Sequence, residues 1–172
     1  SQMEARKGLE PDKMLELLAK ELVPNITNAD KASLFYGVID RRTYELSYSS
    51  VGRVEAYLQV YGDSGLQSLE ACGPSLSKEF NTKPLSMKIQ LNSRDRIVIA
   101  TEGLVSAQNS DGQTWSGEGL RNAIRLAPRQ GVHELRNEIL HQSERFTGRT
   151  SPLRDQIVIV MEVKDKVIKL AK

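Results

Sequence analysis

The sequence predicts an α+β fold in which helices cover antiparallel sheets. Three observations predict it: a helical period near the start, a run of short apolar or alternating segments between residues 32 and 100, and two longer helical segments followed by one more apolar strand. Short strands joined by tight turns form a meander, in which neighbouring strands are antiparallel. A chain of 172 residues has the length of one domain.

The first predicted helix covers residues 9–22, because Pro11 suits a first turn, apolar residues recur at helical spacing and Pro24 ends the pattern. The strands expected after it are 32–39, 44–48, 54–60, 66–70, 85–91 and 97–100. Strands 32–39 and 97–100 are apolar nearly throughout, which is typical of strands covered on both faces. In the strands at 44–48, 54–60 and 85–91 apolar residues alternate with polar ones, so these strands are expected to bury one face only.

Helices return in the last part of the chain. The expected elements are one helical turn at 104–108, helices at 116–126 and 132–146, and a buried strand at 157–161. A break at 148–152 precedes that strand. The segment around Val167 either extends the strand or forms an edge hairpin with it.

Composition excludes several classes of function. The chain has 24 Lys and Arg against 22 Asp and Glu, a balance too even for a nucleic-acid or anionic-membrane partner. The single Cys72 excludes an intrachain disulfide, and with only His133 and His141 beside it a zinc site is nearly excluded. No apolar run is long enough to span a bilayer, and the N-terminus lacks the apolar stretch of a signal peptide. A soluble, cytoplasmic domain with carboxylate or hydroxyl chemistry remains.

Two acidic residues lie at the ends of buried strands. Glu102, within Thr101-Glu102-Gly103, directly follows the strand at 97–100, and Asp155 stands just before the strand at 157–161. A carboxylate there, followed by a glycine that lets the backbone approach a ligand, suits an oxygen site for Mg²⁺ or Mn²⁺. The structural alternative is also open, because polar residues are common at strand ends and Asp155 can form a simple ion pair with Arg154.

Five short motifs stand in order along the chain: LFYGVID at 34–40, YELSY at 44–48, RDRIVIATEGLVSA at 94–107, NSDG at 109–112 and LRDQI at 153–157. They resemble the motifs LFYGVLD, GELTYAN, GDRLLLYTDGVTEA, NxxGE and QRDDIT of the SpoIIE/RsbU-type branch of the PPM metal-dependent serine/threonine phosphatases. No single motif is specific, but five in the correct order are hard to obtain by chance.

This resemblance implies an αββα sandwich of two antiparallel sheets flanked by helices, with a two-metal site between the sheets. Two Mn²⁺ or Mg²⁺ ions would there activate a water that attacks a phosphoserine or phosphothreonine. The resemblance also implies Glu102 and Asp155 as metal ligands. Proteins of this branch typically dephosphorylate an anti-anti-sigma-factor partner.

The chain departs from the family pattern at its start and in its first acidic motif. The family's leading strands, its early Asp-and-Gly metal motif and its first long helix would precede residue 8, so we expect residues 1–172 to be a single, N-terminally incomplete domain. Glu102 stands where the family has aspartate, and its extra methylene moves the oxygens by about 1.5 Å at full extension. Mg²⁺ tolerates little such error.

A third departure lies after the second strand of the meander, where the family's Asn-Ala-Gly-His is Ser50-Val51-Gly52-Arg53. Gly52 is expected to keep the structural turn, as Gly103 does in its own motif. The histidine is lost. Arg53 is either a phosphate-binding residue, since guanidinium groups bind phosphate bidentately, or a solvated surface arginine.

Two hypotheses of different classes follow. The favoured one is a phosphatase-like regulatory output domain of bacterial signalling, inactive or incomplete in this chain and acting through partner binding or dimerisation. The alternative is an active Mn²⁺- or Mg²⁺-dependent phosphoserine/phosphothreonine phosphatase acting on an anti-anti-sigma-factor-like partner. Exposed sheet edges would favour a homodimer. Neither nucleic-acid binding nor membrane insertion is expected.

Overall fold

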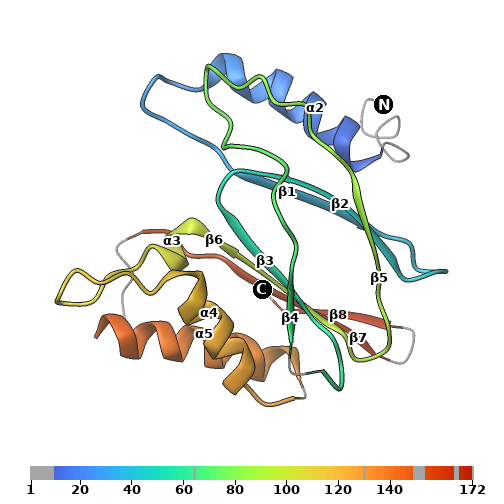
Figure 1. The fold of residues 1–172 in the computed structure, drawn as a ribbon, viewed down its shortest axis with the longest axis vertical. Helices are drawn as coiled ribbons and strands as arrows, with labels where there is room; N and C mark the ends of the chain where they lie inside the picture. Colours follow the sequence, from blue (N-terminus) through green and yellow to red (C-terminus); the bar gives the residue numbers. More distant parts are fainter. Residues whose placement is uncertain (1–9, 64, 130, 149–153, 165–166, 172) are drawn as a thin grey trace. The chain divides into compact units, whose positions relative to one another are not determined.

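The computed structural model describes residues 10–63, 65–129, 131–148, 154–164 and 167–171. They form two compact units, Ser1–Val54 with Glu70–Leu91 and Glu55–Leu69 with Asn92–Lys172. Two antiparallel sheets with flanking helices confirm the predicted α+β class (Figure 1). The elements in chain order are α2 (Pro11–Leu22), η1 (Val23–Asn25), β1 (Leu34–Ile39), β2 (Glu45–Val51), β3 (Val54–Gln59), β4 (Leu66–Ser68), β5 (Met87–Gln90), β6 (Arg96–Thr101), α3 (Glu102–Val105), α4 (Ser116–Leu126), α5 (Val132–Thr147), β7 (Val158–Lys164) and β8 (Val167–Ala171).

The first unit is built on a three-stranded sheet in the order β1-β2-β5, with β2 antiparallel to both neighbours. Helix α2 packs against β1 and β2. It begins at Pro11, whose fixed φ suits the first helical turn. The core beneath α2 is closed by the buried residues Leu15, Ala19, Val51 and Leu76.

Strand β1 corrects the prediction that residues 32–39 are covered on both faces. The strand lies at an edge of its sheet, and Val38 keeps 44% of its surface exposed. Strand β5 is the other edge, so Met87 is exposed although it alternates with polar neighbours. Apolar composition alone does not distinguish an edge strand from a central one.

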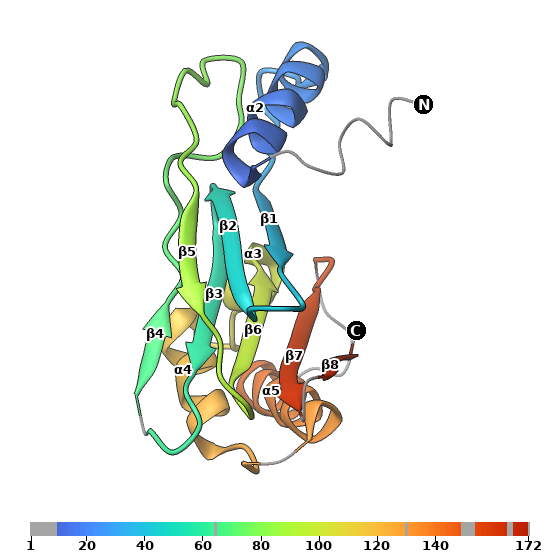
Figure 2. The ribbon, with the colours of Figure 1, turned by 90° about the vertical axis from the view of Figure 1, so that its right-hand side faces the viewer.

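The second unit is built on a five-stranded sheet in the order β4-β3-β6-β7-β8. Helices α4 and α5 pack against each other, and α5 also packs against β7 and β8 (Figure 2). Central strand β6 is buried nearly throughout, as its composition predicted. The main core residues are Tyr57, Val98, Ala100, Leu104, Trp115, Leu120, Ala123, Ile124, Leu135, Ile139, Val158 and Val160.

Strand β3 was expected to bury one face, and this prediction is wrong. Tyr57 and Gln59, at the polar positions of the alternation, are as buried as Ala56 and Leu58. The reason is its place between β4 and β6, where the Tyr57 ring joins the core that also contains Leu120. An aromatic or amide side chain with a hydrogen-bond partner is compatible with such a position.

The chain's last strands settle an alternative that the sequence left open. β7 and β8 form an antiparallel hairpin, with Lys164 opposite Val167. Helix α4 has the predicted bounds, α5 ends one residue later, and α3 begins at Glu102, two residues before the predicted turn. Most of the predicted break at 148–152 lies outside the described residues.

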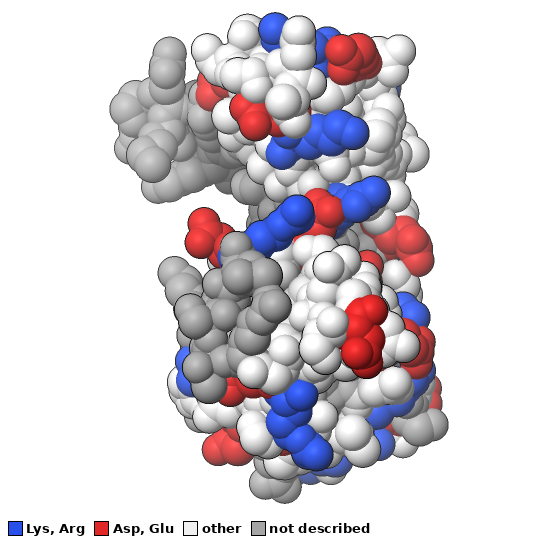
Figure 3. All heavy atoms as spheres, turned by 90° about the vertical axis from the view of Figure 1, so that its left-hand side faces the viewer, with Lys and Arg blue, Asp and Glu red and all other residues white. Residues whose placement is uncertain are grey.

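Among the described helices, none combines the length and apolar composition needed to cross a membrane. On the face drawn in Figure 3, Lys and Arg side chains are interspersed with Asp, Glu and uncharged residues. A continuous basic patch, which nucleic-acid binding uses, is not seen on that face.

Candidate functional site

The two acidic motifs come together at one end of the five-stranded sheet. Glu102 is the first residue of α3, directly after β6, and Asp155 lies three residues before β7. β6 and β7 are antiparallel, with Ala100 opposite Val158. The end of β6 and the start of β7 therefore share one end of the sheet.

Hydrogen bonds extend this pairing beyond the strands. The N–H of Thr101 donates to the carbonyl of Ile157 over 3.1 Å, and the N–H of Ile157 donates to Oγ1 of Thr101 over 3.0 Å. The threonine side chain thus serves as acceptor where the backbone turns into α3. A further bond of 3.4 Å runs from Nε2 of Gln156 to the carbonyl of Gly103. Both acids are consequently carried by backbone segments that are tied to each other.

Gly103 is the point of closest approach between the segments. A Cβ at this position would overlap the carbonyl oxygen of Asp155 and lie 3.1 Å from its carbonyl carbon. It would also lie 3.5 Å from Cβ of Arg154. The sequence predicted a glycine that admits a ligand; in the structure the main chain of Asp155 occupies this space.

The donor set at this end of the sheet fits only part of a metal centre. Glu102 is half-buried and Asp155 is exposed. Within the described ranges there is no group of three or more His, Cys, Asp or Glu residues that could hold a metal ion. Mg²⁺ can bind through one or two carboxylates with waters and phosphate oxygens. A two-metal centre must hold two ions about 4 Å apart, and two carboxylates are too few for it.

Gly52 and Arg53 belong to the first unit. Gly52 joins β2 to β3 with φ of +85°, and a Cβ there would crowd the side chains of Ser33 and Ser75. The backbone N–H of Arg53 donates to Oγ of Ser33 over 2.9 Å, and its side chain is exposed. The turn geometry is thus built for glycine. The two acids lie in the second unit, and Arg53 is described with its own unit alone.

Sequence reasoning missed a buried arginine. Arg96 has only 2% of its surface exposed. Its Nε and Nη2 donate to Oε1 of Gln59 over 2.9 and 2.5 Å, and its Nη1 donates to the carbonyl of Pro128 over 2.8 Å. Burial lowers the pKa of Arg96, because water no longer solvates the charge. The available signal was an Asp-Arg pair directly before a buried strand.

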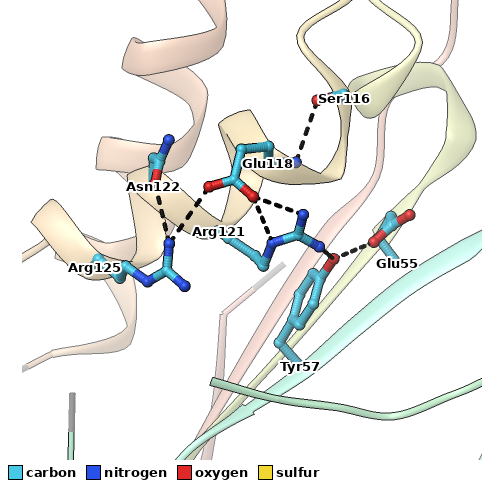
Figure 4. Close-up of polar contacts among 7 residues, drawn as sticks. All are labelled: Glu55, Tyr57, Ser116, Glu118, Arg121, Asn122 and Arg125. Carbon is cyan, nitrogen blue, oxygen red and sulfur yellow. Dashed lines mark hydrogen bonds and ion pairs between the residues drawn. The ribbon is translucent and has the colours of Figure 1, made fainter. Parts of the chain in front are cut away.

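A second missed group joins β3 to α4 (Figure 4). The Tyr57 hydroxyl donates to the carboxylate of Glu55 and accepts from Nη1 of Arg121 over 2.9 Å. Nε and Nη2 of Arg121 also donate to Oε2 of Glu118 over 3.0 and 2.7 Å. The pKa of Tyr57 is raised to about 12, mainly because the hydroxyl is buried and secondly because it is hydrogen-bonded to Glu55. This network ties α4 to β3, in the same sheet as β6, the strand that Glu102 follows.

A sequence model of the family described as Stage II sporulation protein E (SpoIIE) matches residues 2–164. No curated protein sequence matches the chain. Among solved structures, the chain is similar to the SiaA-PP2C domain of Pseudomonas aeruginosa, with a TM-score of 0.76 and 17% identity, over 95% of this chain and 64% of that one. It is also similar to the manganese-presoaked phosphatase domain of the cell fate determinant SpoIIE from Bacillus subtilis, with a TM-score of 0.64 and 14% identity, over 95% and 70%.

A third similar structure contains the RsbU and RsbW domains of a Mycobacterium tuberculosis protein, with a TM-score of 0.73 and 18% identity, over 95% of this chain and 45% of that one. The chain therefore spans less than two thirds of the first and third of these proteins. At these identities the structural likeness shows the fold: two antiparallel sheets flanked by helices.

Proposed function

Because the chain belongs to the SpoIIE family of PPM-type phosphatase domains, we propose that it is a phosphatase-like regulatory output domain of bacterial signalling that acts by binding a protein partner. The observation that carries this proposal is the donor set. Glu102 and Asp155 share one end of the sheet, and no larger group of potential ligands occurs in the part of the chain that the structure describes. Such a set can hold one Mn²⁺ or Mg²⁺ weakly but falls short of a two-metal hydrolytic centre.

An active Mn²⁺- or Mg²⁺-dependent phosphoserine or phosphothreonine phosphatase is the second candidate function. The hydrogen bonds between Thr101 and Ile157, with the close approach at Gly103, favour it. They hold the backbones of two carboxylate residues together, as a metal site requires. Further ligands would have to come from residues outside those described.

The proposed partner is a phosphorylated regulatory protein of the anti-anti-sigma-factor type. Arg53 is our candidate contact for its phosphate, because a guanidinium pairs with phosphate oxygens through two parallel hydrogen bonds. The rigid turn at Gly52 would set the direction in which Arg53 leaves the backbone. If Arg53 has this role, Arg53→Ala weakens binding of the phosphorylated partner and leaves binding of its unphosphorylated form unchanged.

A second copy of the chain is the other proposed partner. β1 and β5 are the edges of the three-stranded sheet, and β4 and β8 are the edges of the five-stranded sheet. Edge strands present unpaired N–H and C=O groups, which favour pairing with another chain. Light scattering at high protein concentration tests this, and a strictly monomeric chain would refute it.

Isothermal titration with Mn²⁺ separates the two candidate functions. The experiment compares the wild type with Asp155→Asn and uses Asp111→Asn, which changes an exposed acid in a turn, as the matched control. If the chain is a binding domain, we expect at most one weakly bound Mn²⁺ per chain and no hydrolysis of p-nitrophenyl phosphate. Two tightly bound Mn²⁺ ions and hydrolysis, both lost in Asp155→Asn and kept in Asp111→Asn, would overturn it and establish the enzyme.

A further inference from the structure

A pocket of about 490 Å³ lies in the second unit, at the other end of β6 and β7 from Glu102 and Asp155. Arg94 precedes β6 and Lys164 ends β7, and both line it. Six residues of β6 separate the two ends by about 20 Å. We propose that this pocket binds a small soluble molecule through a phosphate or carboxylate group.

Three permanent cations line the pocket from separate parts of the chain: Arg94 before β6, Arg129 before α5, and Lys164 at the end of β7. His133 adds a fourth basic side chain. Guanidinium groups match the geometry of carboxylate and phosphate oxygens bidentately, and an ammonium adds a point charge. The volume lies within the range of roughly 300–1,000 Å³ that small-molecule sites occupy.

Arg94 and Arg129 are each held in place by a hydrogen bond from one guanidinium nitrogen. Nη1 of Arg94 donates to the Tyr61 hydroxyl over 2.7 Å, and its guanidinium carbon lies 4.9 Å from the centre of that ring. Nη1 of Arg129 donates to the carbonyl of Asp63 over 2.9 Å. Each guanidinium has five N–H donors, so these bonds leave donors for a ligand oxygen.

Hydrogen bonds hold the backbone on both sides of Arg94. The buried carboxylate of Asp95 accepts from the N–H of Tyr61 over 2.9 Å and from the N–H of Asn92 over 2.8 Å. Arg94 itself has φ of +71°, and its N–H donates to the carbonyl of Val163 over 2.5 Å. Left-handed backbone is unfavourable for a residue with a side chain, yet the chain places a cation at this position of the pocket.

Two acids, Glu134 and Glu162, also line the pocket. A Cβ at Gly131 would overlap the carboxylate of Glu134, which therefore folds back over the start of α5, where a negative charge is stabilised. Glu162, only 8% exposed, stands opposite Arg96 in the β6–β7 register, and its charge opposes the lowering of the Arg96 pKa by burial. The three permanent cations outnumber these two carboxylates by one, so the pocket keeps a positive excess.

The test is an NMR titration of the amide spectrum with inorganic phosphate and, separately, with acetate, at constant ionic strength. We expect saturable shifts at the amides of Val132 and His133. In the double variant Arg94→Ala/Arg129→Ala the affinity should fall by about tenfold or more, because charged hydrogen bonds are lost. The matched control is Arg42→Ala/Arg125→Ala, which removes two exposed arginines outside the pocket.

Saturation by phosphate alone assigns a phosphorylated ligand, and saturation by acetate alone a carboxylate. Absence of saturable shifts with either anion, or equal affinity in both double variants, would overturn the proposal. Lys164→Gln provides the comparison if the arginine variant does not fold. Asp155→Asn should leave the titration unchanged, so this result is independent of the metal experiment.

Discussion

Gly103 lies so close to the main chain of Asp155 that a single methyl group on its Cα would overlap the Asp155 carbonyl oxygen. The two acidic motifs are thus coupled through their backbones. Thr101 and Ile157 form hydrogen bonds on the adjoining residues, so the coupling involves backbone and side chain together. A change at Gly103 should be felt at both acids.

Gly103→Ala is therefore expected to destabilise the fold by about 2 kcal/mol or more, because the overlapped atom belongs to backbone and must move. Chemical denaturation measures the change. The matched control is Gly65→Ala, whose added Cβ would meet only the Asp63 side chain at 3.4 Å or more. It should change stability by no more than about 0.5 kcal/mol. Equal effects of the two substitutions would contradict the coupling.

Tyr57 makes stability depend on alkaline pH. Its pKa is raised from 10.0 to about 12 by burial and by the Glu55 carboxylate. A raised folded-state pKa stabilises the protein below the unfolded value of 10.0 and is lost as pH rises through about 12. The full difference is at most about 3 kcal/mol, since solvent screening at the hydroxyl reduces it. Denaturation between those pH values measures it.

Tyr57→Phe is the control for this dependence, since it cannot ionise. The burial-raised pKa of Tyr48 acts in the same direction, but it is present in both proteins and cancels in the comparison. The wild type should lose more stability than Tyr57→Phe over this pH range. If stability falls with pH equally in the two proteins, the pKa of Tyr57 is the same in the folded and unfolded states and the prediction is wrong.

Arg96→Met tests the buried arginine. The change leaves Oε1 of Gln59 without its charged donor in a buried place, and it also removes the part-buried hydrogen bond to the Pro128 carbonyl. We expect a loss of about 3 kcal/mol, because a buried acceptor left unpaired costs about 1–3 kcal/mol and a second hydrogen bond is lost with it. Arg125→Met, at a side chain that is 46% exposed, should cost no more than about 0.5 kcal/mol. A similar small loss at Arg96 would mean that water replaces it freely.

Periodicity predicted elements well where one rule governs a segment. Helix α4 matched at both ends, because Pro128 follows it closely and its apolar spacing is regular. Strands were harder. β1 and β6 are similarly apolar, yet β1 is an exposed edge and β6 a buried centre, since only the sheet order distinguishes them. That order depends on contacts between residues far apart in sequence.

The candidate site, like the fold, could be predicted from the sequence only in part. Glu102 and Asp155 were chosen from their places at the ends of buried strands and from motif order, and the structure places their segments at one end of the sheet. Nothing local in the sequence could show that the backbone of Asp155 fills the space beside Gly103. The roles of Arg96 and Tyr57 were also not predicted, because their hydrogen-bond partners are distant in the chain. These partners are Gln59, Pro128 and Arg121.

Gly119 in α4 offers a case in which helix propensity and packing oppose each other. Alanine within a helix is favoured over glycine by about 1 kcal/mol. Here a Cβ would lie 2.6 Å from both Cδ1 and Nε1 of Trp115, a ring that is almost fully buried. Because the ring packs in the core beneath α4 it cannot move away cheaply, so Gly119→Ala should destabilise the fold by about 1–3 kcal/mol.

Trp115 is the only tryptophan, so its fluorescence reports directly on this contact, and denaturation should be followed by fluorescence and far-ultraviolet circular dichroism together. The control is Asn122→Ala on the exposed side of the same helix, which should be neutral or slightly stabilising because alanine has the higher helix propensity. Gly119→Ala should shift both the emission of the folded protein and the unfolding midpoint. A stabilised variant with unchanged emission would mean that the indole has room to rotate, and that propensity rather than packing decides the sign.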